Sequence, residues 1–381
     1  MKFISLDDAA TLIFATARDK KGVFALLGEP GIGKTSLIRR LSELTGFKVA
    51  EIMNVPGTDV GDVGVPMPNH ETKTTELYPN SHWGFHTGEP MILCLDEFSK
   101  GSKPLQTILH PLLYKDDGTH RRIGAFKIHP DSIIVITGNL TTDGVGDTLA
   151  AHTNSRLTKL HIRKPNNDEW CEWAIDAGLA PELVSWAKLN PRLFASYTDG
   201  HLEDNDYVFN PTNAAQRGNP YVTPRSLAEC SSIVYAYTGG RINYTQCDAA
   251  LQGTIGVSAA RDLMAHMDLG QQIPSPAEIR ANPAYATVPQ SAPAQIMCLL
   301  NALKWVPGDF DKPATDVRAD LDAWFTYFIR MSKEAQAMFI EAVMTSAKRA
   351  TSSRSLMVKL RNVLVTHEQY KKWATENHYM F

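Results

Sequence analysis

The chain has 381 residues, of which 43% are hydrophobic and 21% are charged. This length allows two or three domains, and the composition excludes a disordered, collagen-like or disulfide-scaffold protein. The 38 basic and 41 acidic residues give a formal charge of −3, which argues against a protein that mainly coats nucleic acid.

Alternating strand and helix patterns fill the first 165 residues. Short apolar runs predict five strands, at 23–27, 47–52, 91–95, 133–137 and 158–162. Helical spacing predicts helices at 6–18, 34–44 and 105–114. Residues 55–90 are rich in Gly, Pro and polar side chains and fit no single long element, whereas 119–128 suggest a hairpin arm. The alternation predicts a parallel five-stranded sheet in an α/β core over residues 1–165.

Helical patterns dominate after Pro165. They predict helices at 170–177, 226–237 and 259–267, and later at 294–305, 316–331, 333–349 and 353–365. Between these groups, prolines concentrate in residues 271–293, which predicts a linker. We therefore expect a helical region over 166–270, followed by the linker and a helical C-terminal extension over 271–381.

Neither a membrane span nor a secretion signal is expected. No apolar run approaches the roughly 18 residues that a membrane helix needs, and Asp7 and Asp8 interrupt the hydrophobic start of the chain. The five cysteines are scattered and form no CxxC pair, which is typical of buried thiols in a reducing compartment. These features predict a cytoplasmic protein.

The strongest motif has the spacing GxxxxGKT and lies between an apolar strand and a helix. Its residues are Gly28, Glu29, Pro30, Gly31, Ile32, Gly33, Lys34 and Thr35, followed by Ser36. Backbone N–H groups of such a loop surround phosphate oxygens, and the following helix adds a favourable dipole. Lys34 is suited to the β- and γ-phosphates and Thr35 to Mg²⁺. We therefore expect residues 28–36 to bind ATP.

Two further strands end in polar residues. The apolar run 91–95 is followed by Asp96 and Glu97, and the run 133–137 by Gly138 and Asn139. Ligands of α/β proteins bind at the carboxyl edge of the sheet, where these side chains would lie. Asp96 would support Mg²⁺, Glu97 would activate the attacking water and Asn139 would position it. The alternatives are a helix-capping acidic pair and an ordinary Gly-Asn turn.

Together these motifs resemble the AAA+ ATPases, over about residues 20–240. The long segment 55–90, the Asp96-Glu97-Phe98 junction and the segment 119–128 resemble the MoxR group within that family. The resemblance implies a P-loop αβα sandwich whose lid is formed by residues 166–270. It also implies a homo-oligomeric ring, expected to be a hexamer, in which 55–90 form an insertion and 119–128 a hairpin facing the pore. The stretch 248–267 and the helical tail resemble members that act beside von Willebrand factor A-type partners.

The resemblance also assigns roles to two arginines. Arg156, in the sequence Asn154-Ser155-Arg156-Leu157, would be a finger acting on ATP of the neighbouring subunit, although Leu157 replaces the family's Phe and Arg163 is a rival. Arg225, in Thr223-Pro224-Arg225-Ser226, would be the lid arginine that contacts the γ-phosphate. The alternative is an ordinary surface arginine for Arg156, and a structural arginine paired with nearby carboxylates for Arg225.

Two weaker features leave the substrate open. Arg121, Arg122 and Lys127 make the expected hairpin basic, which suits nucleic acid or an acidic polypeptide, although a solvated face is the simpler interpretation. The aromatic residues Tyr78, Trp83 and Phe85 fit either substrate contact or a small satellite core.

The sequence therefore predicts an Mg-ATP-hydrolysing ring that remodels a protein client. A nucleic-acid-dependent motor is the alternative, and a nucleotide-dependent scaffold without turnover is a third interpretation.

Overall fold

The computed structural model describes residues 2–17, 22–49, 52–114, 120–124, 126–140, 153, 155–200, 202, 205–211, 218–270, 273–305, 314–349 and 356–378. The chain divides into two units, Met1–Pro165 with Pro211–Ala215, and Asn166–Asn210 with Gln216–Phe381. We describe each unit by itself.

The first unit is built on a parallel sheet with the strand order β1-β11-β2-β10-β7-β3, in which β4 also pairs with β7. Its strands are β1 (Phe3–Ile4), β2 (Val23–Leu27), β3 (Lys48–Val49), β4 (Met53–Asn54), β7 (Met91–Asp96), β10 (Ile133–Gly138) and β11 (Leu157–Ile162). The predicted parallel sheet is confirmed, but the described residues contribute seven strands to it rather than five. The additional β1 and β4 have two residues each, too few to produce a periodic pattern.

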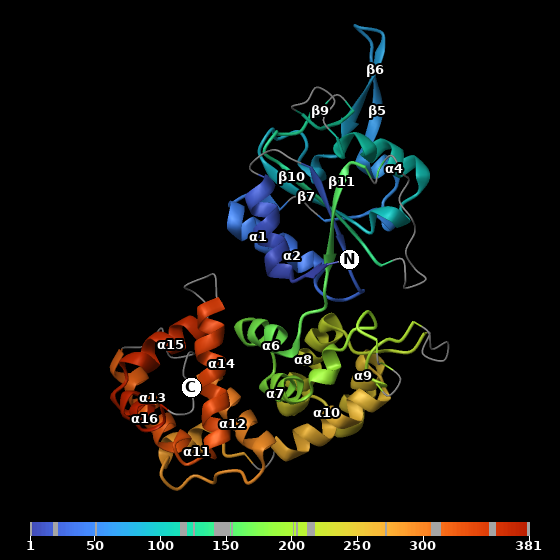
Figure 1. The fold of residues 1–381 in the computed structure, drawn as a ribbon. Helices are drawn as coiled ribbons and strands as arrows, with labels where there is room; N and C mark the ends of the chain where they lie inside the picture. The colour runs from blue at the N-terminus through green and yellow to red at the C-terminus, as the bar shows by residue number, and fades with distance from the viewer. Residues whose placement is uncertain are drawn as a thin grey trace. The chain divides into compact units, whose positions relative to one another are not determined.

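Helices cover both faces of this sheet (Figure 1). Phe24 and Leu26 of β2 belong to a core shared with α1 (Leu6–Ala17) and α2 (Lys34–Thr45). Val23 and Ala25, which point to the opposite face, belong to a core shared with α4 (Lys103–Leu109). Because both faces are buried, the central strands are apolar at nearly every position.

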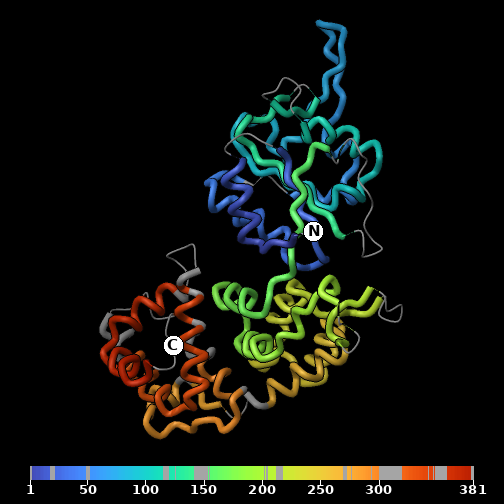
Figure 2. The backbone as a smooth tube through the Cα atoms, viewed as in Figure 1, coloured from blue at the N-terminus to red at the C-terminus, as the bar shows by residue number. Residues whose placement is uncertain are grey.

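The segment 55–90, for which the sequence predicts no long element, contains a hairpin of β5 (Gly64–Asn69) and β6 (Thr74–Pro79). The hairpin projects from the rest of the first unit and ends in a narrow turn (Figures 1 and 2). Short helical turns flank it, namely η1 (Val55–Gly57), α3 (Val60–Val63) and η2 (Ser81–Trp83). Trp83 and Phe85 are buried in the core between the sheet and α4, whereas Tyr78 is 52% exposed.

A second, shorter hairpin consists of β8 (Arg122–Ile123) and β9 (Phe126–Lys127). Its two basic residues Arg122 and Lys127 are exposed and lie opposite each other. The expectation that Arg121 adds to this basic surface is wrong. Arg121 is only 8% exposed and donates a hydrogen bond to the Gly22 carbonyl, 2.8 Å away. Burial lowers its pKa.

The helix predicted at 105–114 is shorter than expected. It begins at Lys103 and ends at Leu109, and the 3₁₀ turn η4 (His110–Leu112) follows. Pro111 explains the change, because it has no N–H group for a helical hydrogen bond.

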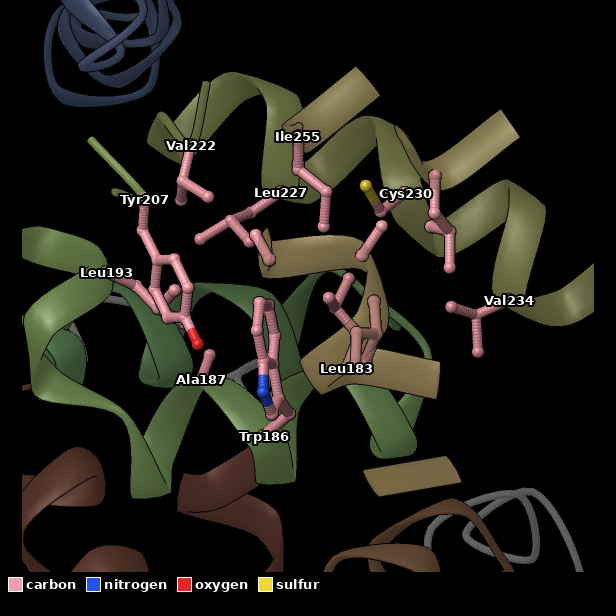
Figure 3. Close-up of a cluster of buried hydrophobic side chains, with 14 of the residues drawn as sticks. Leu183, Trp186, Ala187, Leu193, Tyr207, Val222, Leu227, Cys230, Val234 and Ile255 are labelled. Carbon is pink, nitrogen blue, oxygen red and sulfur yellow. The ribbon is translucent and has the colours of Figure 1, made fainter. Parts of the chain in front are cut away.

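The second unit is helical and has two apolar cores. The first core unites α6 (Asn167–Asp176), α7 (Pro181–Leu189), η6 (Pro191–Phe194), α8 (Pro224–Thr238), α9 (Tyr244–Ile255) and α10 (Val257–Gly270). Trp186, Leu183 and Leu227 lie at its centre (Figure 3). No helix within the described ranges is long and apolar enough to cross a membrane.

The second core joins the helices nearer the C-terminus. They are α11 (Pro276–Ala281), α12 (Ala292–Trp305), α13 (Ala314–Phe328), α14 (Lys333–Arg349), α15 (Leu356–Thr366) and α16 (Glu368–Glu376). The expected linker 271–293 therefore contains a helix. Ser275 begins α11 with a capping box, in which Ser275 and Glu278 bind each other's backbone N–H groups. The division at residue 270 stays a prediction.

Candidate functional site

The loop between β2 and α2 has the backbone that phosphate binding requires. Gly31 and Gly33 have φ angles of 72° and 98°, in the left-handed region that residues other than glycine rarely adopt. A Cβ at Gly28 would lie 2.6 Å from the Ile32 Cδ1 atom and 2.8 Å from the Ile162 carbonyl oxygen. The loop is therefore specified by its glycines, and its fixed curvature can direct N–H groups toward an anion.

The other loop residues divide into anchors and accessible positions. Ile32 is 1% exposed and packs in the core with α1 and α2, so only its backbone can serve a ligand. Glu29 is also buried, at 8% exposure. Pro30 and Thr35 are half-buried, and the exposed Ser36 donates from its hydroxyl to the Gly33 carbonyl at 2.6 Å.

Lys34, the first residue of α2, lies across this loop. Its ammonium donates hydrogen bonds to the carbonyl oxygens of Gly28 and Glu29, both at 2.9 Å, and to Asn139 Oδ1 at 3.1 Å. Phosphate oxygens accept stronger, charge-assisted hydrogen bonds than carbonyls do. A nucleotide phosphate would therefore compete well for the same donors, next to Asn139.

Thr137 holds the acidic residues at the same edge of the sheet. Its hydroxyl donates to Asp96 Oδ1 and accepts a hydrogen bond from the Glu97 backbone N–H at 3.0 Å. This is possible because β10 and β7 are adjacent and parallel, so their carboxyl ends coincide. Burial, assisted by the Asp96 carboxylate, also raises the pKa of the nearby Cys94 thiol, which keeps this thiol neutral.

Glu97 has an unusual local geometry. It adopts a left-handed backbone with φ 52° and ψ 41°, and its Oε2 atom forms an ion pair with Lys100 at 2.9 Å. Lys100 ends the short helical turn η3 (Phe98–Lys100). Neither Thr137 nor Lys100 was predicted from the sequence to belong to this site. The signals were present, because Thr137 is the polar residue in an apolar run and Lys100 is three residues from Glu97.

The oxygen donors at this edge suit a magnesium ion. Thr35 offers a hydroxyl and Asp96 a carboxylate, and oxygen ligands of this kind are those that Mg²⁺ prefers. Together with the glycine-determined loop and the Lys34 ammonium, this donor set fits a magnesium-bound nucleoside triphosphate.

The predicted finger Arg156 does not lie at the carboxyl edge of the sheet. Arg156 precedes β11 and therefore lies at the amino edge of the parallel sheet, opposite to the phosphate loop. It is exposed, and its guanidinium lies 5.1 Å from the centre of the Tyr114 ring. Asn154, two residues before Arg156, falls outside the described residues. The rival Arg163 follows β11, where its backbone N–H donates to the Ile4 carbonyl at 3.0 Å.

Arg225 belongs to the second unit. It is exposed in the first turn of α8, next to a capping box between Thr223 and Ser226. Pro224 precedes it at the start of the helix, as the sequence predicts.

Comparisons with known proteins agree with the architecture. Residues 23–157 match the family model of the AAA domain, dynein-related subfamily, which covers a little over a third of the chain. The first unit thus has the P-loop αβα fold of AAA+ proteins, and a helical region follows it. A search of curated proteins finds no match.

Solved structures give distant similarity. The Thermotoga maritima RuvB Holliday junction branch migration motor is 14% identical, with 74% of this chain and 75% of that chain covered and a TM-score of 0.34. The Aeropyrum pernix ORC2 protein, solved as ADPNP-ADP complexes, is 12% identical, with 89% and 84% covered and a TM-score of 0.36.

Proposed function

We propose that this protein is an Mg²⁺-dependent ATPase whose nucleotide site lies at the carboxyl edge of the sheet. One observation carries the proposal. Groups from three separate segments meet at this edge: Lys34 contacts Asn139, and Thr137 joins Asp96 to Glu97. The match of residues 23–157 to the AAA domain supports the same conclusion.

The proposed reaction assigns one task to each group. Loop N–H groups and Lys34 would bind the phosphates, and Thr35 and Asp96 would hold Mg²⁺, which would neutralise phosphate charge. Asn139 would orient a water molecule against the γ-phosphorus. Glu97 would accept the proton of this water as its oxygen bonds to phosphorus and the bond to the β-phosphate oxygen breaks. ADP and inorganic phosphate would be the products.

More specific proposals concern the assembly and the biological role of the protein. We propose a homo-oligomeric ring of the MoxR type, with Arg156 acting on the neighbouring subunit's nucleotide and Arg225 coupling the nucleotide to the helical lid. A hexamer, a protein client and a von Willebrand factor A-type partner follow from the sequence resemblance alone. Phosphate release would let the lid move and so transmit force to the client.

A nucleic-acid-dependent motor is the second candidate. Arg122 and Lys127 support it, because they lie opposite each other and are exposed on the β8–β9 hairpin. The burial of Arg121 reduces the basic surface that this interpretation needs. Several-fold stimulation of ATP turnover by DNA would favour the second candidate over a protein remodeller.

Substitution of Glu97 by Gln tests the proposal. The amide keeps the size of the side chain but cannot accept the proton, so turnover should fall by roughly 10²- to 10⁴-fold while ATP remains bound. Phosphate release and binding of a fluorescent ATP analogue would measure the two effects. Lys34→Ala is the matched control for the loop and should weaken binding itself. Unchanged turnover in Glu97→Gln would exclude Glu97 as the base.

A further inference from the structure

Two contacts determine the geometry of Glu97, and they act on different parts of the residue. The hydrogen bond from its N–H group to Thr137 Oγ1 holds the backbone in the left-handed conformation. The ion pair with Lys100 holds the carboxylate, through Oε2 at 2.9 Å. Neither contact replaces the other, because a fixed backbone still leaves the long side chain several rotamers.

The ion pair contributes little to folding. The side chains of Lys100 and Glu97 are 28% and 36% exposed, and ion pairs in such solvent-accessible positions stabilise proteins only weakly. Its main physical consequence is to orient the Glu97 carboxylate. Restricting a glutamate side chain to one rotamer costs substantial conformational entropy, and this cost offsets the attraction of the ion pair. Lys100 is well suited to this restriction, since it lies on the same short turn as Glu97 and within three residues of it.

We infer that Lys100 is a positioning residue for the ATPase reaction. It binds one oxygen of the Glu97 carboxylate and so directs the other oxygen toward the attacking water. Lys100 makes no contact with the nucleotide in this proposal and acts through Glu97. The inference rests on the proposed function of Glu97 as the base.

Substitution of Lys100 by Met removes the ammonium and retains most of the aliphatic chain. Without the ion pair, the carboxylate populates several rotamers, and kcat should fall by roughly 5- to 30-fold. The KM for ATP and the binding of a fluorescent ATP analogue should remain unchanged, because the phosphate loop is intact. Lys100→Arg retains the positive charge and the hydrogen-bond donors and should restore most of kcat.

Lys103→Met is the matched control. Lys103 is an exposed lysine at the start of α4, three residues further along the chain, and its substitution should leave kcat at the wild-type value. Thermal unfolding of all variants would verify that they fold.

A double substitution separates positioning from a general effect. If Lys100 acts through Glu97, adding Lys100→Met to Glu97→Gln should cause no further loss in single-turnover rate. A further loss of the same 5- to 30-fold would overturn the inference, and so would an unchanged or increased kcat in Lys100→Met alone. These results differ from a failure of the proposed function, in which the wild-type protein itself would not hydrolyse ATP.

Discussion

Thr137 has a larger structural role than its position in an apolar strand suggests. It is 2% exposed, and one hydroxyl serves both the Asp96 carboxylate and the Glu97 backbone. Thr137→Val keeps the shape but leaves the Glu97 N–H without its acceptor, which should reduce the free energy of unfolding by about 1–3 kcal/mol. Turnover should fall as well, since Glu97 loses its backbone restraint. Urea unfolding and phosphate release measure the two effects.

Thr137→Ser is the control for this prediction, because it retains the hydroxyl and loses only a methyl group. It should lie close to the wild type in both measurements. Equal stability of the Val and Ser variants would contradict the bridging role.

At the level of single residues, the sequence predicted that Lys34 and Asn139 would both lie near the phosphates, and the structure brings the two side chains into contact although 105 positions separate them. Strand polarity made this possible, because the carboxyl ends of parallel strands share one edge. Thr137 and Lys100 were missed for a physical reason. Their roles depend on which side chain lies opposite across the sheet or the turn, and spacing alone does not determine that partner.

At the level of elements, the strength of the pattern determined what could be predicted. The buried strands β2, β7 and β10 were predicted to within a residue or two of their ends, because both of their faces are apolar. The partly exposed β11 was predicted equally closely from its alternating apolar and polar residues. The β5–β6 hairpin was missed because three prolines and a largely solvent-exposed face remove the alternation that would mark a strand. Its stability comes from cross-strand pairing along six registered pairs, which a one-dimensional pattern does not contain.

The contact between α7 and α10 makes the stability of the helical unit dependent on pH. His266 of α10 is 7% exposed, and its Nε2 atom lies 2.6 Å from Ser185 Oγ of α7. Burial lowers the pKa of His266 to about 4, although the Asp262 carboxylate acts in the opposite direction. A histidine in the unfolded chain titrates near pH 6.5. Between these values the unfolded chain binds a proton that the folded chain does not.

The stability that depends on neutral His266 is therefore fully present above about pH 6.5 and is lost as the pH falls toward 4. The loss is on the order of 3 kcal/mol across this window. Urea unfolding at several pH values, followed by tryptophan fluorescence, would measure it. His266→Gln does not titrate and should show a shallower decrease over the same range. Parallel pH curves for the two proteins would contradict the assignment to His266.

At the level of the whole molecule, the sheet polarity separates Arg156 from the nucleotide site of its own chain. Arg156 precedes β11, and six residues of this strand separate it from the carboxyl edge. At about 3.3 Å per residue, this separation is roughly 20 Å, which is several times the reach of an arginine side chain. A contribution of Arg156 to ATP hydrolysis therefore requires a second copy of the chain.

This requirement can be tested by mixing two inactive variants. Arg156→Ala keeps its own phosphate loop but lacks the finger, and Lys34→Ala has the finger but a damaged loop, so each alone should lose most turnover, by roughly 10³-fold or more for the finger. In mixed assemblies, a loop from the first variant can meet a finger from the second. Phosphate release should therefore recover partly on mixing and rise with the assembled fraction.

Mixing Lys34→Ala with Glu97→Gln is the control for nonspecific stabilisation. Its sites with an intact loop lack the base, so this mixture should stay inactive. An Arg156→Ala protein with wild-type turnover would show that this arginine has no part in hydrolysis. A failure to recover in verified mixed assemblies would show that the two residues do not act across a subunit boundary.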